Sequence, residues 1–123
     1  MKEYAITPVA KPRQTRSDKW KQRPAVMRYR AFADEVRAAG LKIGETLSVV
    51  FYLPMPKSWS KRKREKMKCE PHQQKPDIDN LVKALLDAVL DDDSHVYEIR
   101  AVKFWDETGS FFILDEEWNN DTH

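Results

Sequence analysis

The sequence predicts an α+β domain, a small mixed β-sheet with helices packed on one side. Apolar residues alternate along residues 45–53, as in a half-buried strand, and recur every three to four positions along residues 80–90, as in an amphipathic helix. The other segments complete the order strand, helix, strand, short helix, helix, strand, strand. The length of 123 residues suits one compact domain. We therefore expect a single domain over residues 1–123, with a disordered tail from about residue 117.

The first third of the chain predicts a strand, a basic loop and a helix. Residues 3–9, EYAITPV, are interpreted as a short strand that ends at its proline. Residues 10–23 are polar and basic and show no period, which indicates a loop. Pro24 suits the first position of a helix and Gly40 suits its C-terminal cap. These two residues bound a predicted helix over residues 24–39.

The middle of the chain predicts a strand followed by a short basic helix. Residues 45–53 place four apolar side chains on one face of a strand: Leu47, Val49, Phe51 and Leu53. Two prolines then end the strand, because proline cannot donate a hydrogen bond to the sheet. Residues 58–69 are strongly basic and predict a short helix capped by Ser58 or Ser60.

The last third predicts the clearest helix and two strands. Residues 80–90 carry a wide apolar stripe, and Asp79 stands where an N-cap belongs. Residues 95–105 and 110–115 are interpreted as strands. The stretch DETG between them, which ends at Gly109, is typical of a hairpin turn.

The net charge of +2 hides a strong polarity along the chain. Residues 1–53 have a net charge of +6 and residues 54–75 again +6, whereas residues 76–123 have −10. Such asymmetry predicts a polyanionic partner for one part and a cation for the other, and phosphates and metal ions suit those roles. The alternative is that the oppositely charged parts simply attract each other within the fold.

The composition excludes other classes of protein. There is no apolar run of the roughly 18 residues that a membrane span needs, and the N-terminal segment lacks the apolar core of a signal peptide. A single cysteine, Cys69, cannot form an internal disulfide. A cytoplasmic protein without a membrane partner is the expectation.

Six aspartates lie between Asp77 and Asp93, and they are the candidate catalytic residues. Asp77 and Asp79 are two residues apart in a link that we expect to be extended, so both carboxylates would point the same way. Lys83 follows one helical turn after Asp79. Asp92 or Asp93 would join them if the helix ended early, near Leu86, and the chain doubled back; the sequence leaves this open. Two or three carboxylates suffice to bind Mg²⁺ together with phosphate oxygens.

Each of these residues also has a structural interpretation. Asp79 can be an N-cap and nothing more, and Lys83 with Asp87 is an ordinary i,i+4 surface pair. The three aspartates at 91–93 can be a solvated loop. A lone histidine in a turn, His72, is expected to be polar surface and not a metal ligand.

The stretch KPDIDNLVKALLDAV, followed by DDSHV, resembles the RusA family of Holliday junction resolvases, endonucleases common in prophage-derived genes. The resemblance implies a homodimer that uses Mg²⁺, or Mn²⁺ in its place, to cut four-way DNA junctions symmetrically in recombination and repair. It implies that Asp77, Asp79 and Asp93 bind metal with Asp92 beside them, that Lys83 is the catalytic lysine, and that Asn80 supports the site. The loop AVLDDD is shorter than in longer members and has no glycine, which leaves the choice between Asp92 and Asp93 open.

The basic residues before the aspartates are the predicted DNA-binding surface. These residues are Arg13, Arg16, Lys57, Lys61, Arg62, Lys63, Arg64 and Lys75. Two other functions fit the same sequence. One is a non-catalytic module that binds branched DNA, in which the aspartates are caps and solvated loop. The other is a nuclease of broader specificity that cuts several branched DNA forms during phage DNA processing.

Overall fold

The computed structural model describes residues 1–13 and 23–114. In chain order its elements are β1 (Lys2–Tyr4), α1 (Pro24–Ala38), β2 (Thr46–Pro54), α2 (Lys61–Met67), α3 (Ile78–Val89), β3 (Glu98–Asp106) and β4 (Ser110–Ile113). The predicted fold class is confirmed: one mixed four-stranded sheet is combined with three helices in the part of the chain that is described. Arg16 and the predicted disordered tail lie outside the described residues.

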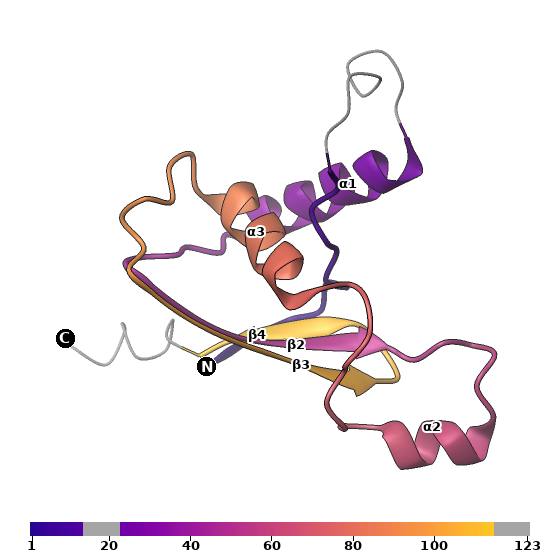
Figure 1. The fold of residues 1–123 in the computed structure, drawn as a ribbon. Coiled ribbons are helices and arrows are strands. Elements are labelled where there is room, and N and C mark those ends of the chain that lie inside the picture. The colour runs from indigo at the N-terminus through magenta and orange to yellow at the C-terminus, as the bar shows by residue number, and fades with distance from the viewer. Residues whose placement is uncertain (14–22, 115–123) are drawn as a thin grey trace.

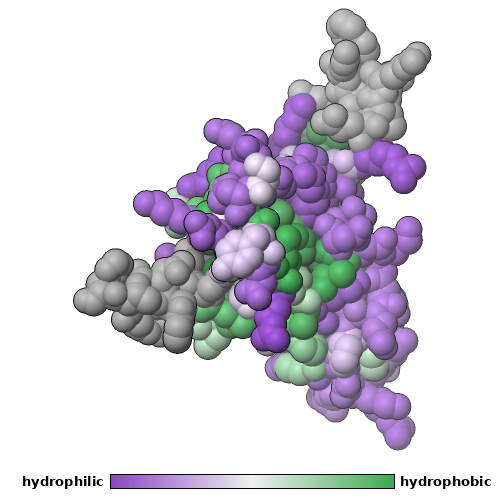
Figure 2. Space-filling model, turned by 60° about the vertical axis from the view of Figure 1, so that its left-hand side comes forward, coloured by the Kyte–Doolittle hydropathy of each residue, from purple (hydrophilic) through white to green (hydrophobic). Residues whose placement is uncertain are grey.

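Two helices, α1 and α3, cover one face of the sheet, as Figure 1 shows, and the core lies between the two layers. Phe51 of β2, Leu85 of α3 and Phe111 of β4 are fully buried there. The alternating strand and the striped helix predicted from the sequence therefore face each other. Figure 2 shows the apolar atoms gathered in the middle of one face, with hydrophilic side chains around them.

The strand order is β1-β4-β2-β3, with β2 parallel to β3 and antiparallel to β4. The predicted hairpin between β3 and β4 is therefore wrong, because β2 lies between these strands and pairs with both. The connection crosses the end of β2 and packs Gly109 against Thr7, where an added Cβ would lie 2.5 Å from Thr7 Oγ1. The glycine that suggested a tight turn is thus required for space.

The parallel pairing of β2 and β3 requires a crossover connection, and α2 and α3 lie in it. α2 stands apart from the other two helices, to the side of the sheet (Figure 1), and none of its residues is buried. Its N-cap is Ser60, one of the two predicted candidates, whose side chain accepts a hydrogen bond of 3.2 Å from Lys63 N.

After α2 the chain pairs with the outer edge of β3. Cys69 N donates to Trp105 O at 2.8 Å, and His72 N donates to Lys103 O at 3.0 Å. His72 is buried, and its ring centroid lies 4.0 Å from that of Trp105. The prediction that His72 is polar surface is therefore wrong: pairing with the strand carries the residue under the tryptophan. No helix in the described ranges has the length and apolar character needed to cross a membrane.

The predicted start of α3 needs correction, whereas its end lies within one residue of the predicted residue 90. The helix begins at Ile78, so its N-cap is Asp77 and not Asp79, which lies in the first turn. The extended link thus stops at Asp77. The helix continues to Val89 and does not end near Leu86, and its C-cap Leu90 is already extended. The chain reverses direction only after Leu90, which determines where the last aspartates can lie.

Candidate active site

The start of α3 presents two carboxylates to solvent. Asp77 is exposed, and its side chain makes no capping hydrogen bond. Its main-chain oxygen instead accepts from Asn80 N at 3.1 Å and from Leu81 N at 3.2 Å. Asp79 is also exposed, in a first turn where the helix dipole favours an anion. No hydrogen bond or ion pair within the described residues involves either carboxylate, so both are available to a ligand.

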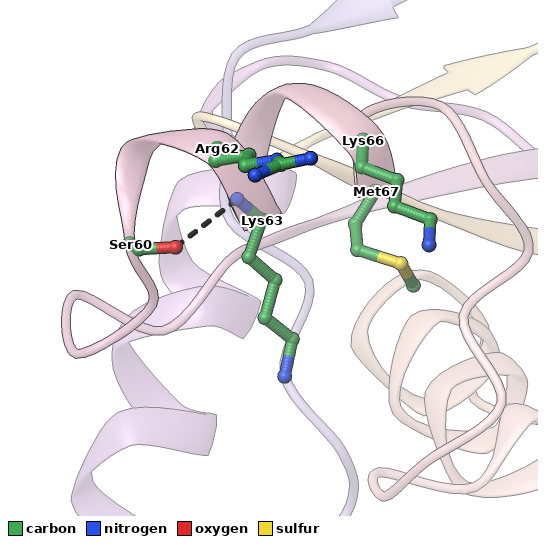
Figure 3. Close-up of a pocket in the computed structure, with 5 residues that line it drawn as sticks. All are labelled: Ser60, Arg62, Lys63, Lys66 and Met67. Carbon is green, nitrogen blue, oxygen red and sulfur yellow. Dashed lines mark hydrogen bonds between the residues drawn. The ribbon is translucent and has the colours of Figure 1, made fainter.

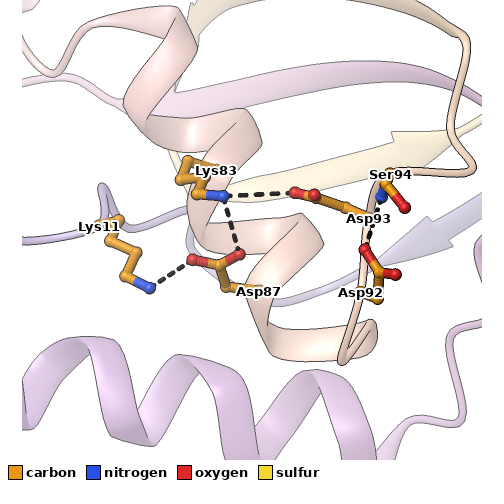
Figure 4. Close-up of polar contacts among 6 residues, drawn as sticks. All are labelled: Lys11, Lys83, Asp87, Asp92, Asp93 and Ser94. Carbon is orange, nitrogen blue, oxygen red and sulfur yellow. Dashed lines mark hydrogen bonds and ion pairs between the residues drawn. The ribbon is translucent and has the colours of Figure 1, made fainter.

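Lys83 links the middle of α3 to the loop that follows it. Its Nζ lies 3.3 Å from Asp93 Oδ2 and 3.3 Å from Asp87 Oδ1 (Figure 4). The hydrogen bond to Asp93, followed by that to Asp87, raises the pKa of Lys83 above its usual value. Lys83 therefore remains a cation, and its side chain is 54% exposed. The loop brings Asp93 back to Lys83 although the helix does not end early, near Leu86, which was the condition left open for this approach.

The neighbouring aspartate has a different environment. Asp92 Oδ1 accepts a hydrogen bond of 2.9 Å from Ser94 N, and this bond lowers the pKa of the carboxyl group (Figure 4). Asp92 thus closes a local turn of the loop, whereas Asp93 contacts Lys83. The two aspartates between which the sequence left the choice open thus have different partners.

A hollow beside α3 is lined by three cationic residues, two of which were predicted from the sequence. The α3 hollow, of about 420 Å³, is lined by Lys11, Pro12, Arg13, Asn80 and Lys83. Arg13, Asn80 and Lys83 were predicted site residues, but Lys11 was not. The Nζ atom of Lys11 forms an ion pair with Asp87 (Figure 4), and its main-chain N donates to Asn80 O at 3.1 Å. The basic character of residues 10–23 includes Lys11, but no local pattern predicts its pairing with Asp87, which lies 76 positions away in the chain.

Lys103 is a second residue that the sequence analysis missed. From β3 its Nζ donates to the main-chain oxygens of Gln74, at 2.5 Å, and Pro76, at 2.6 Å. Burial lowers the pKa of Lys103, and the negative charge of Asp77 opposes this shift. A signal was present in the sequence: Lys103 alternates with Ala101 and Trp105, so it points to the same side of β3 as these apolar residues.

α2 carries half of the predicted DNA-binding residues. Three cationic side chains and one apolar side chain of α2, together with its N-cap, form the α2 hollow, of about 350 Å³, which is lined by Ser60, Arg62, Lys63, Lys66 and Met67 (Figure 3). Lys63 Nζ lies 4.3 Å from the ring centroid of Trp59. Arg64 Nη1 donates to Pro56 O at 2.9 Å, which ties the helix to the preceding turn. Lys57, Lys61 and Lys75 are exposed.

The described residues do not form a closed metal site. Within residues 1–13 and 23–114, no group of three acidic, histidine or cysteine side chains is arranged to hold a metal ion. The donor chemistry of Asp77, Asp79 and Asp93 nevertheless fits a hard divalent cation, because carboxylate oxygens are the ligands that Mg²⁺ prefers. Mg²⁺ usually retains water and takes further ligands from substrate phosphates, so a site that is open without substrate suits it.

The sequence profile of the endodeoxyribonuclease RusA matches residues 4–113, nearly the whole chain. The chain belongs to the RusA family. The uncharacterized protein YqaN of Bacillus subtilis (strain 168) is 40% identical over 80 residues, which cover 58% of this chain and 56% of that protein. The chain thus spans about half the length of the curated relative that it matches. The RusA match extends from the last residue of β1 to the end of β4 and confirms the resemblance seen in the motif around Asp77.

Proposed function

We propose that this RusA-family protein is a Mg²⁺-dependent endodeoxyribonuclease that resolves four-way DNA junctions by paired symmetric nicks. One observation carries the proposal: the loop after α3 brings Asp93 to Lys83, on the helix that begins with Asp77 and Asp79. Acidic and cationic groups are thereby placed along one helix within a fold that belongs to an endodeoxyribonuclease family. With DNA as its substrate, the protein would act in the cytoplasm, in the recombination and repair of prophage-type DNA.

The chain's own residues have distinct roles in this proposal. Lys83, held as a cation by Asp93 and Asp87, stabilises the negative charge that develops on the scissile phosphate. Lys11 and Arg13 in the α3 hollow bind neighbouring phosphates of the same strand. Asp87 orients both lysines, since it forms an ion pair with each of them.

Asp77, Asp79 and Asp93 would hold the metal ion. The chemistry that Mg²⁺ supplies in such sites is the stabilisation of the attacking and leaving oxygens of the phosphodiester. Mn²⁺ prefers the same oxygen ligands and would replace it. Asp92 supports the site indirectly, because its hydrogen bond to Ser94 fixes the loop that presents Asp93.

The proposed substrate has four arms and requires two symmetric cuts. A homodimer supplies two equivalent active sites related by a two-fold axis, which matches the symmetry of the junction. The exposed cations of α2 would bind the backbone of an arm at a distance from the cut, because α2 stands to the side of the sheet, away from α3 (Figure 1).

The test is cleavage of a synthetic four-way junction compared with linear duplex of the same sequence, with Mg²⁺ and with EDTA. We expect paired symmetric nicks on the junction alone, only with metal, and none from Asp79→Asn. Cleavage of flaps and forks at equal rates would instead indicate the broader branched-DNA nuclease.

A non-catalytic branched-DNA-binding module is the second candidate. It is favoured by the lack of a closed carboxylate cluster among the described side chains. Salt-sensitive junction binding without cleavage at any Mg²⁺ or Mn²⁺ concentration would establish it in place of the resolvase.

A further inference from the structure

Lys103 is a charged side chain on the inward-facing side of a strand. In the register of the sheet it lies opposite Phe51, which is fully buried, and it is itself only partly exposed. An ammonium group in such a place costs free energy unless its donors are satisfied. Here two of its donors are used by the main-chain oxygens of Gln74 and Pro76, at 2.5 and 2.6 Å.

These two oxygens belong to the link that carries Asp77 into α3. The link follows His72, whose N–H is bound to the main-chain oxygen of Lys103 at 3.0 Å. Lys103 thus holds the link through both its main chain and its side chain. Pro76 immediately precedes Asp77, so the side-chain bond ends one residue before the first carboxylate.

The charge of Lys103 acts on the same residue. Asp77 and Lys103 attract each other electrostatically, although no hydrogen bond joins them. Asp77 makes no capping hydrogen bond that would fix its side chain. The positive charge of Lys103 therefore acts on a carboxylate whose side chain no capping hydrogen bond holds in place.

We propose that Lys103 is a positioning residue of the active site: it fixes the Gln74–Pro76 link so that Asp77 and Asp79 are presented together at the start of α3. This inference rests on the proposed function for its catalytic consequence. Residues that orient metal ligands typically affect metal affinity or activity by about 10- to 100-fold when they are removed.

The experiment compares the full-length wild type with Lys103→Met, Lys103→Arg and the control Arg100→Met. Arg100 is an exposed cation on the same strand and pairs in register with Ser48, on the opposite side of the sheet from Lys103. Lys103→Arg retains a cation with several donors, so it should restore what Lys103→Met loses.

Three quantities are measured for each variant: amide hydrogen exchange of residues 74–79, Mn²⁺ binding by electron paramagnetic resonance, and the single-turnover rate of junction cleavage beside the junction Kd. For Lys103→Met we expect amide exchange at residues 74–79 to be faster, Mn²⁺ affinity to be lower and junction cleavage to be slower, each by about 10-fold or more. The junction Kd should stay within about threefold of wild type. Lys103→Arg should lie close to wild type, and Arg100→Met should match it.

Wild-type exchange, Mn²⁺ affinity and cleavage in Lys103→Met would overturn the inference. An equal loss in Arg100→Met would also overturn it, because the effect would then be one of general charge. If Lys103→Met does not fold, Lys103→Ala takes its place: it removes the side-chain donors and the charge, and unchanged Mn²⁺ affinity and exchange in it would likewise refute positioning by Lys103. If the wild type fails to cut junctions, the proposed function fails, whereas exchange and Mn²⁺ binding still decide the role of Lys103.

Discussion

The most informative perturbation of the proposed DNA-binding surface is the removal of three charges from α2. Arg62, Lys63 and Lys66 line the α2 hollow together, and no residue of the helix is buried. Replacing all three by glutamine should leave the fold intact, because each surface substitution usually changes the free energy of unfolding by no more than about 0.5 kcal/mol. Any large effect on junction binding then reports contacts with DNA.

The expected change in the salt dependence of junction binding follows from counterion release. Each phosphate contact contributes about 0.9 to the slope of log K against log salt concentration, so three contacts contribute about 2.7. A fourfold rise in salt, from about 50 to 200 mM, therefore weakens the wild type about 40-fold more than the triple variant. The corresponding control removes three exposed cations elsewhere, as Lys2→Gln, Lys42→Gln and Arg100→Gln.

The assay is the salt dependence of junction binding by fluorescence anisotropy, in EDTA so that no cleavage occurs. We expect the slope to fall by about 2.7 in the α2 variant and by much less in the control. Equal slopes in wild type and the α2 variant would refute the assignment of α2 to the DNA backbone. Equal decreases in both variants would show that binding depends on net charge and not on this helix.

Three further predictions concern the loop, the buried histidine and the core. Asp93→Asn should slow junction cleavage by about 100-fold or more, because a proposed metal ligand loses its charge and Lys83 loses one of its two charged partners. Asp92→Asn should slow it by less than about 10-fold, because its amide oxygen still accepts the hydrogen bond within the loop. Burial holds the pKa of His72 below its usual value of 6.5, so the unfolded chain takes up a proton first as the pH falls. The free energy of unfolding, measured with urea, should therefore decrease as the pH falls below about 6.5, and His72→Phe should decrease less; parallel pH profiles would contradict this. Leu85→Ala removes a fully buried side chain and should lower the free energy of unfolding by about 2–5 kcal/mol; a loss below about 1 kcal/mol would contradict the packing of α3 on the sheet.

The elements that the sequence predicted best are those with a strong hydrophobic period. The alternation along β2 and the stripe along α3 each identify the face that is buried, and these two faces form the core. Pro24 correctly placed the start of α1, which runs from Pro24 to Ala38. In each case the signal is local, because the residues that form the sequence pattern are the same residues that form the structural element.

Pairing between strands was less predictable. The short DETG connection favoured a hairpin, yet β3 and β4 lie on opposite sides of β2. The sequences of β3 and β4 do not determine on which side of β2 each strand pairs, since that depends on the crossover through α2 and α3. The burial of His72 has the same origin, because its pairing with β3 depends on this crossover.

The candidate site was predicted in its residue types but not in its arrangement. The spacing along one segment was enough to identify Asp77, Asp79 and Lys83 as candidates. In the structure they lie in order along α3, starting from its N-cap. Lys11 and Lys103 join the site from distant strands and loops, through contacts with Asp87 and with the link before Asp77. Such contacts exist only after the sheet has formed, so local spacing does not predict them; the alternation of Lys103 with Ala101 and Trp105 indicates only which side of β3 it faces.

The most direct test of the central claim is to measure cleavage and binding of one four-way junction by Asp77→Asn under identical conditions. Asp77 is exposed at the N-cap of α3 and makes no capping hydrogen bond, so its loss should not disturb the helix. If the aspartates serve catalysis, junction cleavage in Mg²⁺ disappears while the junction Kd stays equal or decreases, because a charge that repels phosphate has been removed. Loss of binding together with cleavage, or cleavage at the wild-type rate, would contradict the account.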